Sequence, residues 1–311
     1  MDDPRVKILK SISTEKSRVH LAPQLIFLCG GDVDVRATTN HSIRNMFMNQ
    51  SAPLASKSIQ FVLAENFKDW KEGYSSLSDF ENDIAYLSAK VVVIPETAGS
   101  LTELGLFFGN QAIRKKMTVV LNTPHHESES FIKFGILTPL ETNNQKSVLP
   151  YQIDYSNIDT VEKSEIDEAI SDIIEECESL DKTSLFSADN RGHHLFLIYQ
   201  LIDLFYALTI SELDAYISSL GLETDKKSLK SSLYILQRFD LIFSRKRGHT
   251  YFYCANPNAE KRISFKNLDV QKKFDYPARK LEILDFYQTM SKSDSGFRKR
   301  VGAIRSIDKP Q

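Results

Sequence analysis

Short apolar runs alternate with amphipathic stretches over the N-terminal part of the chain. The apolar runs are LIFLC (25–29), IQFVL (59–63), VVVI (91–94) and TVVLN (118–122). Between them, residues 40–48, 80–88 and 100–114 place apolar side chains at helical spacing. Strands that are apolar throughout and alternate with helices predict a Rossmann-like α/β fold, in which helices cover both faces of a parallel sheet.

A different pattern follows. Residues 123–150 show no clear periodicity and are predicted to be irregular, with strand 118–122 closing the sheet. Isoleucines then recur at helical spacing beneath an acidic face in residues 166–177, and a hinge is expected near residues 189–192. Beyond it, three helical stretches precede a hairpin-like segment, the order typical of a mainly helical winged helix-turn-helix domain. Its third helix is predicted at 226–238, capped near Asp225, and its wing tip at 245–249.

We therefore expect three regions. Residues 1–155 form the α/β domain, residues 156–190 an acidic connecting helix, and residues 191–311 the winged helix domain with a basic C-terminal tail. The chain has 311 residues and a formal net charge of -2, which excludes a uniformly basic nucleic-acid binder. Because acidic residues dominate 151–190 and basic ones dominate from 226 onward, a polyanionic partner would meet the C-terminal part.

The three cysteines, Cys29, Cys177 and Cys254, are widely spaced, so neither a disulfide scaffold nor a metal site is expected. No apolar stretch approaches the roughly 20 residues that span a bilayer. The N-terminus has no apolar signal-peptide core, and a cytoplasmic location is expected without membrane association.

Polar residues follow three of the predicted strands. They are GGD (30–32), AEN (64–66) and PETAGSLTE (95–103). The carboxyl ends of parallel strands meet at one rim, where such sheets bind ligands. Candidate substrate-binding residues at this rim are Gly30, Gly31, Asp32, Glu65, Glu81, Asn82, Gly99 and Ser100. The alternatives are capping by Asp32, a surface charge at Glu65 and a purely conformational role for the glycines.

Glu103 has two interpretations. Ser100-x-x-Glu103 fits a capping box, in which both side chains satisfy free amides at a helix start. Alternatively, the carboxylate faces a cleft at the helix N-terminus and stabilises or attacks the anomeric carbon of a ribosyl group. The convergence of three polar segments favours Glu103 as the catalytic carboxylate.

The sequence gives less support to other nucleotide-binding and catalytic motifs. GGDVDV is not a GxGxxG fingerprint, and the sequence contains neither a P-loop nor a GxSxG motif. The pair His125-His126 is interpreted as a solvated loop pair, because it lacks a nearby carboxylate or Cys at metal spacing. In the C-terminal part, nucleic-acid or partner contacts are predicted at Lys226, Lys227, Lys230, Arg245, Lys246 and Arg247, with Ser231 toward the same exposed helix face. Further contacts are expected from the tail residues Arg298, Lys299, Arg300 and Arg305. A protein-interaction or dimerisation module is the alternative.

The segments FLCGGD (27–32), PETAGSLTELG (95–105), and SFIKFG with QKSVL (130–149) resemble the effector proteins of type II retrons. Those effectors join a nucleoside deoxyribosyltransferase-like domain to a winged helix-turn-helix domain. The first domain is also similar to nucleotide phosphoribohydrolases of the lysine-decarboxylase-like (LOG) group, but the second glycine of their PGGxGTxxE motif is missing. Deoxyribosyltransferases proper carry an aspartate-glycine pair where Pro95-Glu96-Thr97 stands here, so hydrolysis is favoured over base exchange.

The resemblance implies an anti-phage toxin held inactive, within an oligomeric complex, by the retron reverse transcriptase and its multicopy single-stranded DNA (msDNA), which carries a DNA–RNA hybrid. Its reaction would be N-glycosidic cleavage of a nucleotide, with NAD+ as the substrate rather than as a cofactor, giving nicotinamide and ADP-ribose. Glu103 matches the catalytic glutamate of the family, and Gly30, Gly31, Asp32, Gly99 and Ser100 match its substrate-lining loops. A nucleotide sensor that does not cleave its ligand, a LOG-like phosphoribohydrolase and a transcriptional regulator are the alternatives.

Overall fold

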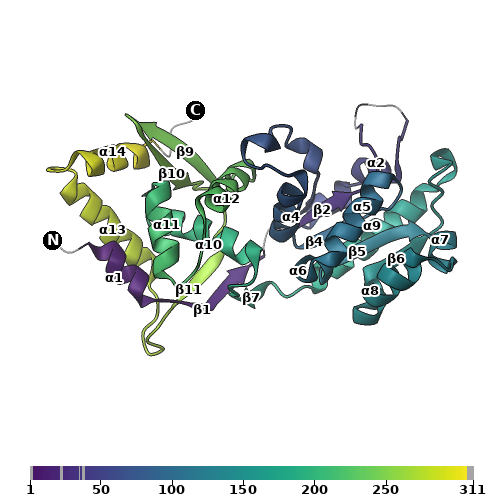
Figure 1. The fold of residues 1–311 in the computed structure, drawn as a ribbon, viewed down its shortest axis with the longest axis horizontal. Helices are drawn as coiled ribbons and strands as arrows, with labels where there is room; N and C mark the ends of the chain where they lie inside the picture. The colour runs from purple at the N-terminus through teal and green to yellow at the C-terminus, as the bar shows by residue number, and fades with distance from the viewer. Residues whose placement is uncertain (1–2, 22–23, 35, 37–38, 307–311) are drawn as a thin grey trace. The chain divides into compact units, whose positions relative to one another are not determined.

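The computed structural model describes residues 3–21, 24–34, 36 and 39–306 and divides the chain into two units (Figure 1). The sheet unit comprises Pro23–Trp70 and Ser75–Asp181, and the helical unit comprises Met1–Ala22, Lys71–Tyr74 and Lys182–Gln311. These units differ from the regions expected from the sequence. The N-terminal segment groups with the helical unit, and the acidic helix groups with the sheet unit.

Five parallel strands form the sheet of the sheet unit. Their order is β3-β2-β4-β5-β6, with bounds β2 (Gln24–Cys29), β3 (Ile59–Val62), β4 (Lys90–Val93), β5 (Met117–Asn122) and β6 (Val148–Tyr151). The first four confirm the parallel α/β sheet expected from the apolar runs. The prediction that residues 123–150 are irregular is wrong, because β6 lies there as an edge strand. It is short and contains Pro150, which an edge strand tolerates but which obscured its pattern.

Helices cover both faces of this sheet. Ile26, Leu28 and Val92 share one core with α2 (Ile43–Asn49), α3 (Ala52–Ser56) and the acidic helix α9 (Lys163–Ser179). On the opposite face, Phe27 packs edge-on against Phe107 of α5 (Ala98–Gly109), with ring centroids 5.8 Å apart. The helix α4 (Leu77–Leu87) also contacts β2. The isoleucines of α9 are thus core residues and its acidic side is solvated.

The helix expected at 100–114 is two helices, because Asn110 ends α5 and its side chain caps α6 (Gln111–Arg114) at 3.2 and 3.4 Å. After β5 come α7 (Thr123–Glu127) and α8 (Thr138–Asn143), joined by a π-helical turn at Lys133–Leu137.

In the helical unit, three helices precede a hairpin, as the sequence predicted. They are α10 (Arg191–Leu204), α11 (Ile210–Ser219) and α12 (Lys226–Arg238), followed by β9 (Ile242–Arg247) and β10 (Thr250–Ala255). Asp225 caps α12 by accepting hydrogen bonds from Lys227 N and Ser228 N at 2.8 and 2.9 Å. Gly248, at φ +63°, supplies the left-handed residue of the hairpin turn. A two-residue strand, β8 (Ala207–Leu208), pairs with the other edge of β10.

A second antiparallel sheet, in the order β11-β1-β7, joins the two ends of the chain. The N-terminal strand β1 (Ile12–His20) lies between β11 (Ile263–Asn267) and β7 (Thr183–Leu185). The helix α1 (Pro4–Ser11) precedes it, and α13 (Tyr276–Met290) and α14 (Ser295–Ile304) follow β11. The segment expected to be a basic tail is therefore mostly helical up to Ile304.

Within the described residues, no helix combines the length and apolar character needed to cross a membrane. The thiols of Cys29, Cys177 and Cys254 are free and buried. No group of three or more His, Cys, Asp or Glu side chains in the same part of the chain is arranged to hold a metal ion.

Candidate functional site

The order of the sheet strands defines where a ligand can bind. Counted along the sheet unit, the order β3-β2-β4-β5-β6 is 2-1-3-4-5, so the direction of winding reverses between β2 and β4. Ligands of doubly wound sheets bind in the crevice at the carboxyl ends of the strands beside such a reversal. The predicted polar segments follow β2, β3 and β4, which are neighbours in the sheet. The structure thus brings the three segments to one rim.

A carboxylate that the sequence analysis did not select, Glu96, holds this rim together. It follows β4, and its Oε1 accepts hydrogen bonds from Gly31 N at 2.7 Å and from Arg44 N at 3.0 Å. Its Oε2 accepts one from Ile43 N at 2.7 Å. The negative charge also suits the N-terminus of α2. One side chain therefore joins the end of β4 to the turn after β2 and the start of α2.

The two glycines after β2 are explained by contacts within the protein. A Cβ at Gly30 would lie 2.8 Å from Arg44 Cβ, and one at Gly31 would lie 2.6 Å from Ser42 Cβ. Neither glycine has a positive φ, and the Gly31 amide is already bonded to Glu96. The absence of a Cβ at these two positions is thus required by the close packing of α2 against the turn. The side chain of Asp32 is exposed beside this turn.

Arg44 is a buried cation at the same rim, and sequence reasoning missed it. Its guanidinium donates to Gly31 O at 2.5 Å, to Leu28 O at 3.3 Å and to the Glu65 carboxylate at 2.5 Å. Glu65 itself is largely exposed, so the pair lies at the surface end of the crevice. The signal that could have identified Arg44 is a single basic residue within the otherwise uncharged stretch IRNMFMN.

Two further carboxyl groups lie in the field of this pair. Glu81, on α4, is buried. Its pKa rises to about 7, chiefly because burial disfavours the anion and also because Glu103 and Glu65 add negative charge. Burial likewise raises the pKa of Glu103, while Arg44 opposes that rise. The site therefore contains one arginine and the four carboxyl groups of Glu65, Glu81, Glu96 and Glu103, and it favours a proton on Glu81 near neutral pH.

The start of α5 excludes the capping interpretation of Glu103. Thr97 is the N-cap: its Oγ1 accepts from Ser100 N at 3.1 Å, and Thr97 N donates to the Ser100 hydroxyl at 3.0 Å. The capping box of α5 is therefore Thr97-x-x-Ser100, one turn before the predicted Ser100-x-x-Glu103, which is wrong. Ser100 is buried as its second residue. Gly99, whose Cβ would meet only Thr97 Oγ1 at 3.6 Å, has no such steric requirement. Glu103 takes no part in the cap.

Two predicted site residues carry orphaned acceptors. Within the described residues, Glu103 Oε2 and Asn82 Oδ1 are the buried side-chain oxygens that have no hydrogen-bond partner. Buried polar groups are normally satisfied, so each exception needs an explanation, of which a catalytic role is one. The Cys29 thiol, whose pKa burial raises well above its usual value, donates a hydrogen bond to the Glu103 carboxylate.

A mainly apolar cavity of about 380 Å³ lies beside the start of α5. It is lined by Pro95–Ala98, Leu101 and Leu121 together with His125, Ser128, Ser130, Ile132 and Tyr155. His125 stacks on Tyr155, with ring centroids 5.7 Å apart, and His126 Nε2 lies 2.5 Å from Glu141 Oε1. The pair therefore lies in the short helix α7 and not in a loop, and His126 has a carboxylate partner, while His125 is exposed as expected.

The predicted basic contacts are only partly exposed. Lys226, Lys227 and Lys230 are exposed around the first turn of α12. On the hairpin, Lys246 is exposed. Arg245 lies over the Phe243 ring at 4.1 Å, and Arg247 donates to Gly302 O of α14 at 2.9 Å. Among the predicted contacts of α12 and the hairpin, most of the exposed cations therefore lie at the N-terminal end of α12.

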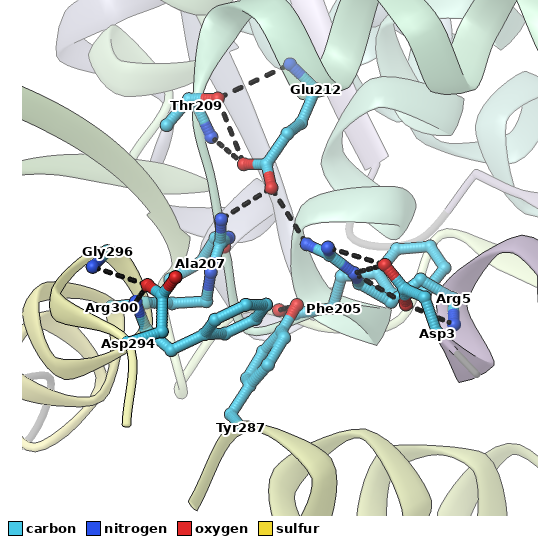
Figure 2. A network of polar contacts seen from close by, with 11 residues as sticks. Asp3, Arg5, Phe205, Ala207, Thr209, Glu212, Tyr287, Asp294, Gly296 and Arg300 are labelled. Carbon is cyan, nitrogen blue, oxygen red and sulfur yellow. Dashed lines mark hydrogen bonds and ion pairs between the residues drawn. The ribbon is translucent and has the colours of Figure 1, made fainter. Parts of the chain in front are cut away.

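The later turns of α12 are covered, contrary to expectation. Ser231 is buried and donates to Gly73 O at 2.7 Å, and Tyr234 packs edge-on against Tyr74. A Cβ at Gly73 would lie 2.2 Å from the Tyr234 ring, so only glycine fits there. Of the four tail residues named from the sequence, Arg300 is buried, where it pairs with Glu212 (Figure 2). Arg298, Lys299 and Arg305 are exposed.

Comparisons with known proteins identify a family and two relatives of this chain. A family model described as STM3845 retron effector protein matches residues 40–245. A protein of retron Ec73 from Escherichia coli is 28% identical over 258 residues, which cover 75% of this chain and 79% of that protein. A protein of retron Ec86 from Escherichia coli is 34% identical over 126 residues, which cover 40% of this chain and only 39% of that protein. The names of both relatives propose a ribosyltransferase/DNA-binding protein.

Proposed function

The chain belongs to the STM3845 family of retron effector proteins, and from this premise we propose that its sheet unit is an N-glycosidase that cleaves NAD+ to nicotinamide and ADP-ribose. On this proposal the sheet unit is a nucleoside deoxyribosyltransferase-like domain. The observation that carries the proposal is the Glu103 carboxylate, which has one buried oxygen without a partner at the rim where α/β sheets bind nucleotides. The proposed ribosyltransferase role in the names of both relatives gives independent support.

Cleavage of an N-ribosyl bond passes through an oxocarbenium-like state, which a nearby anion stabilises. The Glu103 carboxylate supplies that anion or attacks the anomeric carbon directly. The C–N bond breaks with its electron pair going to the pyridinium nitrogen, so nicotinamide leaves as a neutral molecule. Water then adds to the anomeric carbon and loses a proton to give ADP-ribose.

The neighbours of Glu103 suit this role. A protonated Glu81 avoids a second buried negative charge beside Glu103, and Arg44 favours the ionised form of Glu103. Glu65, Asp32 and the orphaned Asn82 Oδ1 can accept hydrogen bonds from ribose hydroxyls. The N-terminus of α5 at Gly99 and Ser100 presents a positive dipole end toward phosphate.

The test is nicotinamide release from NAD+ by the purified full chain and by Glu103→Gln, which keeps the size of the side chain but removes the anion. We expect roughly a 1,000-fold loss of turnover. Glu168→Gln, on the exposed side of α9, is the matched control and should retain full activity. Tight NAD+ binding without turnover by the wild type would instead indicate a nucleotide sensor, and cleavage of AMP in preference to NAD+ a phosphoribohydrolase.

We further propose that the helical unit is a winged helix-turn-helix domain that holds the effector on the retron reverse transcriptase and msDNA until infection releases its toxicity. The exposed lysines of α12 and Lys246 support this role, since they can contact phosphates. In the full chain, the triple substitution Lys226→Glu, Lys227→Glu, Lys230→Glu should abolish co-purification with the reverse transcriptase–msDNA complex. The triple substitution Lys7→Glu, Lys10→Glu, Lys115→Glu, at exposed lysines elsewhere, serves as the charge-matched control. Unchanged recovery of the triple variant would contradict the assignment.

A further inference from the structure

A cavity of about 600 Å³ lies in the helical unit beside the edge strand β11, and it shares no lining residue with the cavity beside α5. Its charged lining residues are all lysines: Lys16, Lys261, Lys266, Lys272 and Lys273. Ser264, Asn267 and Gln271 add hydrogen-bonding groups. No residue of α12 or of the β9–β10 hairpin contributes to it.

These ammonium groups are only weakly compensated by the protein. Lys272 pairs with Asp269 at 3.3 Å, and Lys16 Nζ donates to Leu268 O at 3.4 Å. Lys266 and Lys273 form no ion pair within the described part of the chain. Like charges that share a concave surface repel one another, and a polyanionic ligand would remove that repulsion.

The pKa of a neighbouring histidine, His20, is affected by the same positive charges. His20, on β1, lies 2.8 Å from the Ser264 hydroxyl through its Nε2. Burial lowers the pKa of His20, and the charges of Lys261 and Arg262 lower it further. Lys261 itself lies over the Tyr276 ring at 4.1 Å, which holds its stem at the rim of the cavity. The carboxylates that face this group of cations are Asp269 and, near Lys261, Asp203.

We propose that this lysine-lined cavity binds the backbone phosphates of a nucleic-acid strand, as a second contact surface separate from α12. Several cations with interspersed polar side chains, and no acidic residue in the lining, match the chemistry of a phosphate chain. The concave shape fits a strand of a few nucleotides better than it fits a flat lipid surface. This inference does not depend on the proposed glycosidase activity.

The test is fluorescence anisotropy of a labelled single-stranded DNA 20-mer titrated with the full chain, comparing Lys266→Glu/Lys273→Glu with the charge-matched control Lys7→Glu/Lys10→Glu. We expect the cavity variant to bind at least about tenfold more weakly. The slope of log K against log salt should become shallower by about 1.4, the value for two lost phosphate contacts on a single strand. The control should bind like the wild type.

Thermal melting of each variant verifies folding, and Lys266→Gln/Lys273→Gln, which adds no negative charge, should weaken binding in the same direction. Equal affinity of the cavity variant and the control would overturn the proposal. Displacement of the 20-mer by ATP at an equal phosphate concentration would overturn it in favour of a free nucleotide. If the cavity variant lost binding to vesicles of phosphatidylserine but kept its affinity for DNA, the proposal would be overturned in favour of a membrane.

Discussion

Two glutamates near helix starts show how one sequence pattern can have two outcomes. Ser100-x-x-Glu103 and Thr209-x-x-Glu212 both fit the capping-box spacing, but only the second forms one. Glu212 Oε2 accepts from Thr209 N at 2.9 Å, while its Oε1 accepts from Arg5 at 2.7 Å and pairs with Arg300 (Figure 2). Glu103 has an orphaned oxygen and carboxylate neighbours.

The pKa values of the two carboxyl groups are shifted in opposite directions. Burial alone would raise the pKa of Glu212, but Arg300 and Arg5, with the capping bonds, hold it below its usual range. Burial raises the pKa of Glu103, and Arg44 only partly compensates. A satisfied carboxylate stabilises its unit, whereas an unsatisfied one costs stability and is therefore a candidate for chemistry.

The largest expected effect on stability separates these roles. Glu212→Gln removes the charge between two nearly buried guanidinium groups, and we expect a loss of about 3 kcal/mol in the free energy of unfolding. Glu103→Gln removes an anion that is poorly solvated, so its unfolding free energy should remain unchanged or rise. Urea denaturation of both variants measures the difference. A larger loss for Glu103→Gln would mean that Glu103 is the structural residue of the two.

The contributions of Glu212 and Glu81 to the free energy of unfolding should change with pH in opposite directions. Because the depressed pKa of Glu212 lies below its unfolded value, its contribution is present above that unfolded value and is lost as pH falls. The pKa of Glu81, raised to about 7, has the opposite consequence: the stability linked to its proton is lost as pH rises from about 4.5 to 7.

Glu81→Gln should therefore stabilise the protein at pH 8, by roughly 2 kcal/mol, and have little effect at pH 4. Asp79→Asn, an exposed change in the same helix, is the matched control and should show no such dependence. Unfolding free energies measured between pH 4 and pH 8 provide the test. Parallel profiles for Glu81→Gln and the wild type would show that folding does not shift the pKa of Glu81.

Elements with a strong local signal could be predicted from the sequence. The apolar runs located β2 to β5, and Asp225 with the apolar spacing that follows it located α12. The edge strand β6 could not be predicted, because Pro150 and its polar surroundings hide its pattern. The pairing of β1 with β7 and β11 could not be predicted either, because pairing between residues so distant in the chain leaves no local signal.

The site was predictable to a similar extent. Strand ends identified Glu65 and Glu103, because the carboxyl ends of parallel strands meet at one rim, and Glu81 was selected from the helix that precedes β4. The roles of Glu96 and Arg44 depend on bonds between segments that are far apart in the sequence. Those bonds also explain why the glycine pair after β2 packs against α2, which composition alone could not indicate.

The smallest predicted effect tests the register of the cap on α5. Thr97→Ala removes the bond from Thr97 Oγ1 to Ser100 N and should cost about 1 kcal/mol in unfolding free energy. Ser76→Ala is the matched control, since Ser76 is the N-cap of α4 but makes no side-chain capping bond, and it should cost less. If Thr97→Ala were neutral and Glu103→Ala lost about 1 kcal/mol, the capping box would lie at Ser100-x-x-Glu103. Glu103 would then be a structural residue like Glu212, and the contrast between them would disappear.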